Sequence, residues 1–450
     1  MAGAHRQDPR NGGLRRLLAR LVSGVDPVVL MLPAAAAVGF IGAVAVEGFR
    51  AAMNLLIGLY STQEHLVAAA AELPPWERML VPPIAATAGG LIMWAGQRWV
   101  RLPSGPEYME AIRVGDGRLP LAPNLVRTAS SLPAVSGGIT IGREGTMIQF
   151  AAVISSLLGR AVRLAAPHQR LIVACGAAAG FAAAYRAPIA GTLFVAEIIL
   201  RGLQLREIAA VLVAAVIGEL TTQSLFEVGP LYLVQSIPPV RFADLVDISL
   251  LGLLAGFVGP AFLWLLDASR RRYRAWIGFV PLRMELAGLL IGLLSLLRPE
   301  VWGNGYSTVQ SFVAQPWTLQ AAAAVFVLRL IAVTAASAAG IPGGVLTPTL
   351  SLGGAMGLIV SQLIAGSGGT SSEALWTLTA MGSLLAATTH APAMSAILVF
   401  ETTRSYDVVI ASMPACVIAA VVAHVIHHRS VYSEALGLDA GPDFGRPSQD

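Results

Sequence analysis

The sequence predicts an all-α, polytopic membrane protein made of two repeats of tilted, partly broken helices. Of its 450 residues, 55% are hydrophobic and only 12% are charged, against ~25% charged residues in soluble domains. The shortage of charge extends along the whole chain, which excludes an ordinary soluble fold. A pattern of glycine, proline and glutamate also occurs twice, about 200 residues apart.

Apolar stretches mark the candidate membrane segments. A helix needs ~20 apolar residues to cross a bilayer. Several stretches are shorter, or contain Gly and Pro, which predicts half-helices or steep tilts. Non-helical backbone is tolerated at that depth only where protein buries it or where it lines a cavity. In order, the stretches are 27–60, 79–97, 122–141, 145–167, 171–199, 208–225, 246–266, 275–297, 319–340, 343–366, 374–399 and 408–426.

Basic flanks predict the orientation in the membrane. Residues 1–26 are polar and rich in arginine, the run 270–274 contains four arginines, and the last apolar stretch is followed by His427-His428-Arg429. The positive-inside rule places these segments in the cytoplasm. We therefore expect a multi-pass membrane protein with its N-terminus in the cytoplasm and without a signal peptide. The net charge of +4 reflects these flanks and does not indicate nucleic-acid binding.

An internal repeat divides the chain. Pro188 is followed nine positions later by Glu197, and Pro392 is followed nine positions later by Glu401. A glycine-rich break precedes each pair. Broken segments at matching places predict a repeat transporter whose site lies where the breaks converge. The expected parts are a cytoplasmic segment 1–26, repeats 27–226 and 244–430, a connection 227–243, and a short tail 431–450 without a regulatory soluble domain.

Glu144 is the first candidate site residue. It stands between Arg143 and Gly145 in a mostly small and apolar segment, and an ionisable residue at membrane depth usually marks a transport path. Glycines let the backbone approach a ligand, and a helix beginning here would point its N–H groups at an anion. The hypothesis is an anion site that this carboxylate can itself occupy. The alternative is a structural ion pair with Arg143.

Three motifs resemble the signatures of the CLC chloride channels and transporters. They are Gly142-Arg143-Glu144-Gly145, Gly344-Val345-Leu346-Thr347-Pro348 and the late Tyr432. The resemblance covers about 27–436, and the stretches 182–188, 301–310 and 388–392 look closest to the bacterial ClcB type. It implies a homodimer with one anion pathway per subunit, inverted repeats, and bound chloride ions without any cofactor.

The resemblance also implies a role for each motif residue. Glu144 would be a gate that competes with chloride while charged and swings away when protonated. Helix N-termini bind an anion without a fixed cation that would hold it too tightly. The implied anion-binding groups are the backbone N–H groups of Gly145, Val345 and Leu346 and the hydroxyl of Tyr432. The motif positions with a structural role are Gly142, Arg143, Gly344 and Pro348.

One departure from the family pattern concerns which anion the protein prefers. Where the family has a chloride-binding serine, ungapped counting reaches Pro103, and Ser104 could replace it only with a shift of one residue. Family members with proline at this position resemble nitrate transporters. A lost hydroxyl removes one hydrogen-bond donor, worth on the order of 1 kcal/mol. The preference for chloride over nitrate is therefore open.

A second departure concerns protons. Ungapped matching places Ile198 at the inner glutamate that relays protons in antiporters of the family, and isoleucine cannot titrate. Glu197 is adjacent but points ~100° away on a helix. Its repeat counterpart Glu401 suggests a structural role for both, such as accepting backbone N–H groups. We therefore favour passive or weakly coupled chloride conduction, an electrical shunt in acid resistance, over chloride/proton antiport.

Two other classes remain as alternatives. A repeat-type transporter of another solute would also use broken helices, but the halves lack an acidic pair spaced for a cation. A membrane enzyme, such as a protease, needs a nucleophile and a base. Ser307 has no histidine in a matching apolar segment, so we expect no catalytic residues. Cys175 and Cys416 lie far apart in apolar segments, and no disulfide or metal site is expected.

Overall fold

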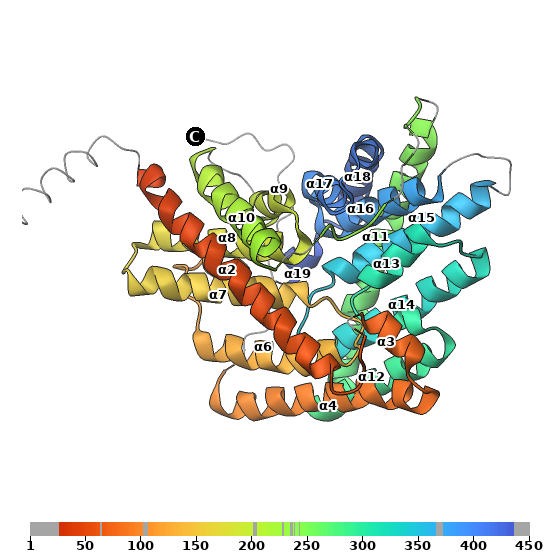
Figure 1. Ribbon diagram of the computed structural model, residues 1–450, viewed down its shortest axis with the longest axis horizontal. Helices are drawn as coiled ribbons and strands as arrows, with labels where there is room; N and C mark the ends of the chain where they lie inside the picture. Colours follow the sequence, from red (N-terminus) through yellow and green to blue (C-terminus); the bar gives the residue numbers. More distant parts are fainter. Residues whose placement is uncertain are drawn as a thin grey trace, which may run out of the picture.

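The computed structural model describes residues 27–63, 65–101, 107–200, 205–226, 229–234, 237, 239–242, 244–365 and 372–435. Over these residues the chain is all-α (Figure 1), and its one isolated β-bridge joins Gly142 to Gly344. Within this part of the chain, eight helices are long and apolar enough to cross a membrane. These findings confirm the predicted polytopic all-α class.

The helices of the N-terminal half follow the predicted stretches closely. They are α2 (Pro27–Ile57), α3 (Leu66–Glu72), α4 (Pro75–Trp99), α5 (Glu107–Arg113), α6 (Leu121–Ser136), α7 (Glu144–Ala161), α8 (Ala166–Tyr185), α9 (Pro188–Leu193), a π-helical turn η1 (Phe194–Leu200) and α10 (Leu205–Phe226).

The C-terminal half contains the remaining helices. They are α11 (Asp244–Trp276), α12 (Val280–Leu297), a 3₁₀ turn η2 (Pro299–Val301), α13 (Tyr306–Ala314), α14 (Leu319–Ala339), α15 (Leu346–Ala365), α16 (Glu373–Thr389), α17 (Pro392–Thr403), α18 (Tyr406–Ile426) and α19 (Val431–Ala435).

The two halves pack tightly against each other through α4 and α12, which lie side by side along the lower edge of Figure 1. Glycine makes this approach possible. A Cβ added at Gly292 would lie 2.2 Å from the carbonyl oxygen of Met79, and one added at Gly90 would lie 2.7 Å from the Cα of Pro281. Larger side chains at these positions would force the two helices apart.

Two stretches that the sequence presents as continuous are each split into two helices. The stretch 171–199 breaks after Tyr185, where Arg186 has φ 57°, and 374–399 breaks at His390, also with φ 57°. Pro188 and Pro392 then begin the next helices. A proline has no N–H and disfavours helical geometry at the residue before it, so each new helix starts at the proline.

The repeated glutamates hold the two halves together at these breaks. Each glutamate accepts hydrogen bonds from backbone N–H groups in the first turn of the other copy's helix. Ala393 and Met394 donate to Glu197 at 3.3 and 2.8 Å, and Ile189 and Ala190 donate to Glu401 at 3.0 and 2.7 Å. A carboxylate at a helix N-terminus satisfies N–H groups that lack an intrahelical partner. Both glutamates therefore have a structural role.

Candidate functional site

The N-termini of α7 and α15 meet at the two glycine-rich breaks. The N–H of Gly142 donates to the carbonyl of Gly344, and the N–H of Gly344 donates back to the carbonyl of Gly142, both at 2.7 Å. A Cβ at Gly142 would lie 2.7 Å from the Gly344 oxygen, and one at Gly145 would lie 3.0 Å from the Gly344 nitrogen. These positions need glycine because two backbones touch there.

Glu144 lies at this meeting point and is buried, with 1% of its surface exposed. Its Oε1 accepts a hydrogen bond from Asn304 Nδ2 at 2.5 Å, and its Oε2 accepts one from Thr347 Oγ1 at 2.7 Å. A Cβ at Gly142 would lie 2.9 Å from Oε2, so the carboxylate folds back toward the start of its own helix. A buried negative charge therefore sits where two helix N-termini converge.

An ion pair with Arg143 is present as well, since Arg143 Nε lies 3.6 Å from Glu144 Oε1. The arginine side chain is 22% exposed, and its Nη1 also points at Met53 Sδ, 3.2 Å away. The pair alone does not account for the carboxylate's surroundings, because each carboxylate oxygen has a shorter bond to a neutral donor. The structural and the gating hypotheses for Glu144 are thus compatible.

The two donors that contact the carboxylate, Asn304 and Thr347, were not predicted from the sequence. Thr347 belongs to the second motif, but no role was assigned to it, and Asn304 lay in a stretch used only for the resemblance. The sequence feature that could have indicated Asn304 is the glycine on each side of it. Gly303 and Gly305 adopt φ of 74° and 116° and form a tight loop. The hydroxyl of Tyr185 meets Thr347 Oγ1 at 3.0 Å and fixes its position.

Tyr432 connects to this site through a column of aromatic rings. Its ring lies 5.9 Å from that of Phe194, which stacks on Phe181 at 4.8 Å, and Phe181 lies 4.6 Å from Tyr185. Tyr185 then reaches Thr347 through its hydroxyl. The column links the start of α19 to the Glu144 carboxylate.

The other predicted binding residues lie at the same helix starts. Gly145 is in the first turn of α7, Val345 directly precedes α15, and Leu346 begins α15 with Pro348 two residues later. Pro103 and Ser104 fall outside the described residues. Among the residues that the structure describes, no group of three or more His, Cys, Asp or Glu side chains could hold a metal ion.

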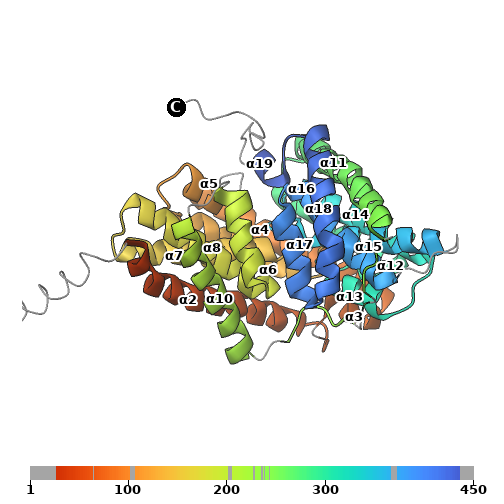
Figure 2. The ribbon, with the colours of Figure 1, turned by 90° about the horizontal axis from the view of Figure 1, so that it is seen from above.

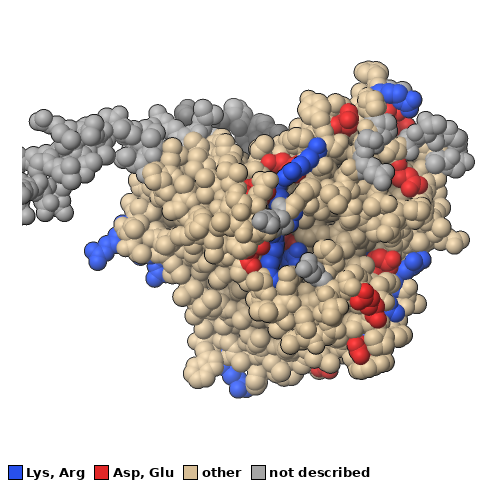
Figure 3. Space-filling model, in the orientation of Figure 1, with Lys and Arg blue, Asp and Glu red and all other residues tan. Residues whose placement is uncertain are grey.

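Arg50, on α2, is a partly buried arginine with partners of its own. It pairs with Glu47 at 2.5 Å and donates to the carbonyls of Ala183 and Ala184, both at 2.9 Å, at the end of α8. Figure 3 shows basic and acidic side chains beside one another near the middle of one face. The Glu144 carboxylate itself takes its two shortest contacts from neutral donors.

Comparison with known proteins identifies the family. The family model described as voltage gated chloride channel matches residues 84–424. A putative chloride channel protein ClcB-like from Ralstonia nicotianae is 42% identical over 90% of this chain and 96% of its own length. The voltage-gated ClC-type chloride channel ClcB of Escherichia coli is 41% identical over 89% and 97%.

Solved structures share the fold. A slow cyanobacterial Cl⁻/H⁺ antiporter superposes with a TM-score of 0.80 at 23% identity, over 92% of this chain and 98% of the antiporter. A CLC-type fluoride/proton antiporter gives 0.76 at 20% identity, over 90% and 97%. The chain belongs to the voltage-gated chloride channel (CLC) family, in its bacterial ClcB type, and is a multi-pass membrane protein of this family of anion channels and transporters.

Proposed function

We propose that this protein conducts chloride, and other monovalent anions, by passive or weakly coupled flow gated by Glu144. The observation that carries the proposal is the buried Glu144 carboxylate, held by Asn304 and Thr347 where the N-termini of α7 and α15 meet. The partial positive charge of helix N-termini suits a small anion. Neutral hydrogen-bond donors hold such an ion weakly enough for it to leave again.

The gate works by competition between the carboxylate and the transported anion. When Glu144 is charged, it occupies the place that chloride needs. When it binds a proton, it loses its negative charge and accepts hydrogen bonds more weakly. Chloride then replaces it at the backbone N–H groups of Gly145, Val345 and Leu346. Tyr432 supplies a hydroxyl donor at the other end of the aromatic column. Anion flux should therefore rise as pH falls.

Weak coupling to protons is supported by the surroundings of η1. Ile198 cannot carry a proton and is buried, with 7% exposed. Its neighbour Glu197 already accepts two backbone N–H groups of α17. Chloride/proton antiport is the second candidate, because the two solved structures above are of proton antiporters. Both structures are less than 25% identical to this chain, so the similarity supports the shared fold and not the transport mechanism.

The proposal also covers the assembly, the location and the physiological role of the protein. The protein would form a homodimer in the bacterial inner membrane with its N-terminus in the cytoplasm. Repeats 27–226 and 244–430 would be inverted, as the family resemblance implies, and the reciprocal bonds of Glu197 and Glu401 fit a two-fold relation between them. Anion flow would act as an electrical shunt for proton-moving systems under acid stress.

Purified protein in liposomes with a chloride gradient tests the proposal. Chloride efflux and internal pH are recorded together, and nitrate then replaces chloride to measure preference. We expect chloride flux with no uphill proton movement. Protons driven against their gradient would establish antiport instead. Absence of any chloride or nitrate flux from folded protein would reject the proposal.

Replacing Thr347 with valine is expected to raise chloride flux at neutral pH. The change removes the hydroxyl that donates to Glu144 Oε2 while keeping the side-chain shape. A hydrogen bond to a charged group contributes about 1.5–3 kcal/mol, which corresponds to a gain in flux of about 10- to 150-fold if the whole bond is lost. Liposome flux at pH 7.5 gives the measurement.

Thr349→Val provides the matched control for this change. Thr349 is also buried on α15, but its hydroxyl donates to the backbone carbonyl of Val345, four residues earlier, at 2.7 Å and does not contact Glu144. Its flux should equal that of the wild type. Equal flux in both variants would mean that Thr347 does not restrain the gate.

A further inference from the structure

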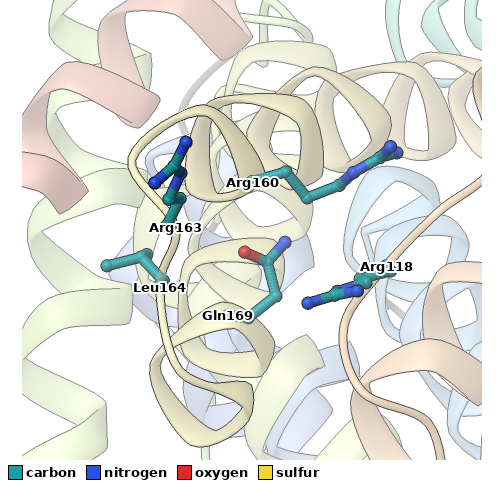
Figure 4. Close-up of a pocket in the computed structure, with 5 residues that line it drawn as sticks. All are labelled: Arg118, Arg160, Arg163, Leu164 and Gln169. Atoms are coloured by element: carbon teal, nitrogen blue, oxygen red, sulfur yellow. The ribbon is translucent and has the colours of Figure 1, made fainter.

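A pocket lined by arginines lies far from Glu144, where the connections α5–α6 and α7–α8 meet. Its cavity volume is about 220 Å³, several times the ~30 Å³ that one water molecule takes in the liquid. Figure 4 shows Gln169 in its middle, with arginines from separate segments around it. The lining residues are Arg118, Arg160, Arg163, Leu164 and Gln169.

Two of the three arginines have no acidic partner among the described residues. Arg118 pairs with Asp116, at 3.4 Å. Arg160 and Arg163 are exposed and form no ion pair within the described ranges. Arg163 also adopts φ 56°, a left-handed conformation that costs an L-residue with a Cβ. The pocket thus has two guanidinium groups available for an anion, and guanidinium matches phosphate geometry.

Gln169 forms the floor of the pocket and joins the two connections. It is 1% exposed, and its Nε2 donates to the carbonyls of Gly117 and Ser156, both at 3.0 Å. Its Oε1 lies against Gly159 of α7, where an added Cβ would be 2.4 Å from it. The amide therefore shapes the pocket, and the arginines supply the groups that can contact a ligand.

The pocket lies where a lipid headgroup can reach it. Val162, between the two free arginines, is 69% exposed, and Leu164 lines the cavity. Arg118 follows α5, which lies at the same edge of Figure 2 as α19, just after the basic end 427–429. Short basic connections face the cytoplasm. The anionic headgroups of the cytoplasmic leaflet bind basic pockets at this depth.

We propose that this pocket binds the phosphodiester of an anionic lipid headgroup, as phosphatidylglycerol presents it. Arg160 and Arg163 would hold the phosphate. Soluble glycerophosphoglycerol carries the same phosphodiester without the acyl chains, so it is the other possible source. The inference is independent of the gating role of Glu144.

Native mass spectrometry of the full-length protein in detergent tests the proposal, with phosphatidylglycerol as the probe. The double variant Arg160→Gln/Arg163→Gln should weaken binding by at least about tenfold, because charge-assisted bonds to phosphate are lost. Arg272→Gln removes an equally exposed arginine near the end of α11 and should bind as the wild type does. Unchanged binding by the double variant, with its melting temperature intact, would overturn the proposal.

A soluble probe separates the two sources of this phosphodiester. Displacement of the bound lipid by glycerophosphoglycerol at micromolar concentration would assign the site to a soluble ligand, whereas failure to displace it would support the lipid.

Discussion

Replacing Glu144 with glutamine is expected to abolish the pH dependence of chloride flux and to hold flux near the acid level of the wild type. In the wild-type protein, a rise in pH leaves more of the carboxylate charged, so it occupies the anion's place and flux falls. Glutamine keeps the size of the side chain but carries no charge at any pH. The flux through the variant at pH 7.5 should therefore exceed that of the wild type.

Liposome chloride efflux between pH 4.5 and 7.5 measures this effect, with proton movement recorded in parallel. Glu110→Gln is a suitable control, because Glu110 is an exposed glutamate in the middle of α5 and should retain the wild-type pH profile. If the Glu144 variant keeps the full wild-type profile, then Glu144 is not the gate and its contact with Arg143 is its main role.

Arg329→Met is expected to destabilise the protein by several kcal/mol, because it leaves buried acceptors without a donor, at a cost of about 1–3 kcal/mol for each unsatisfied group. Arg329 lies on α14 and is 0% exposed. It donates to three backbone carbonyls and two hydroxyls around η2. These acceptors are Glu300 O at 2.6 Å, Val301 O at 3.5 Å, Gly303 O at 3.2 Å, Ser351 Oγ at 3.1 Å and Thr308 Oγ1 at 3.4 Å.

The effect of this change should extend to the gate. Arg329 holds the loop that carries Asn304, and Asn304 donates to Glu144. Protein that still folds should therefore show raised flux at neutral pH. Thermal unfolding in detergent measures the stability. The Arg329→Lys variant should be more stable than Arg329→Met but less stable than the wild type, because an ammonium group cannot reproduce the forked geometry of the guanidinium. If the Arg329→Met variant unfolds at the same temperature as the wild type, Arg329 does not stabilise this loop.

The sequence by itself determined the class of the protein, the repeat and the central glutamate. Composition and apolar length are properties of the chain alone, because each membrane segment must satisfy its own backbone in lipid. The equal spacing of Glu197 and Glu401 from their prolines is also readable without coordinates. Glu144 is also recognisable from the sequence alone, since an ionisable residue in a mostly apolar segment usually has a function.

Only the tertiary structure decided which groups meet that glutamate. Asn304 and Thr347 lie 160 and 203 positions from Glu144, and no local pattern marks two residues so distant as neighbours. Their contact depends on the pairing of Gly142 with Gly344 and on a loop held by Arg329. Hydrogen bonds need donor and acceptor within about 3 Å, and packing between helices, rather than the order of residues, produces that distance.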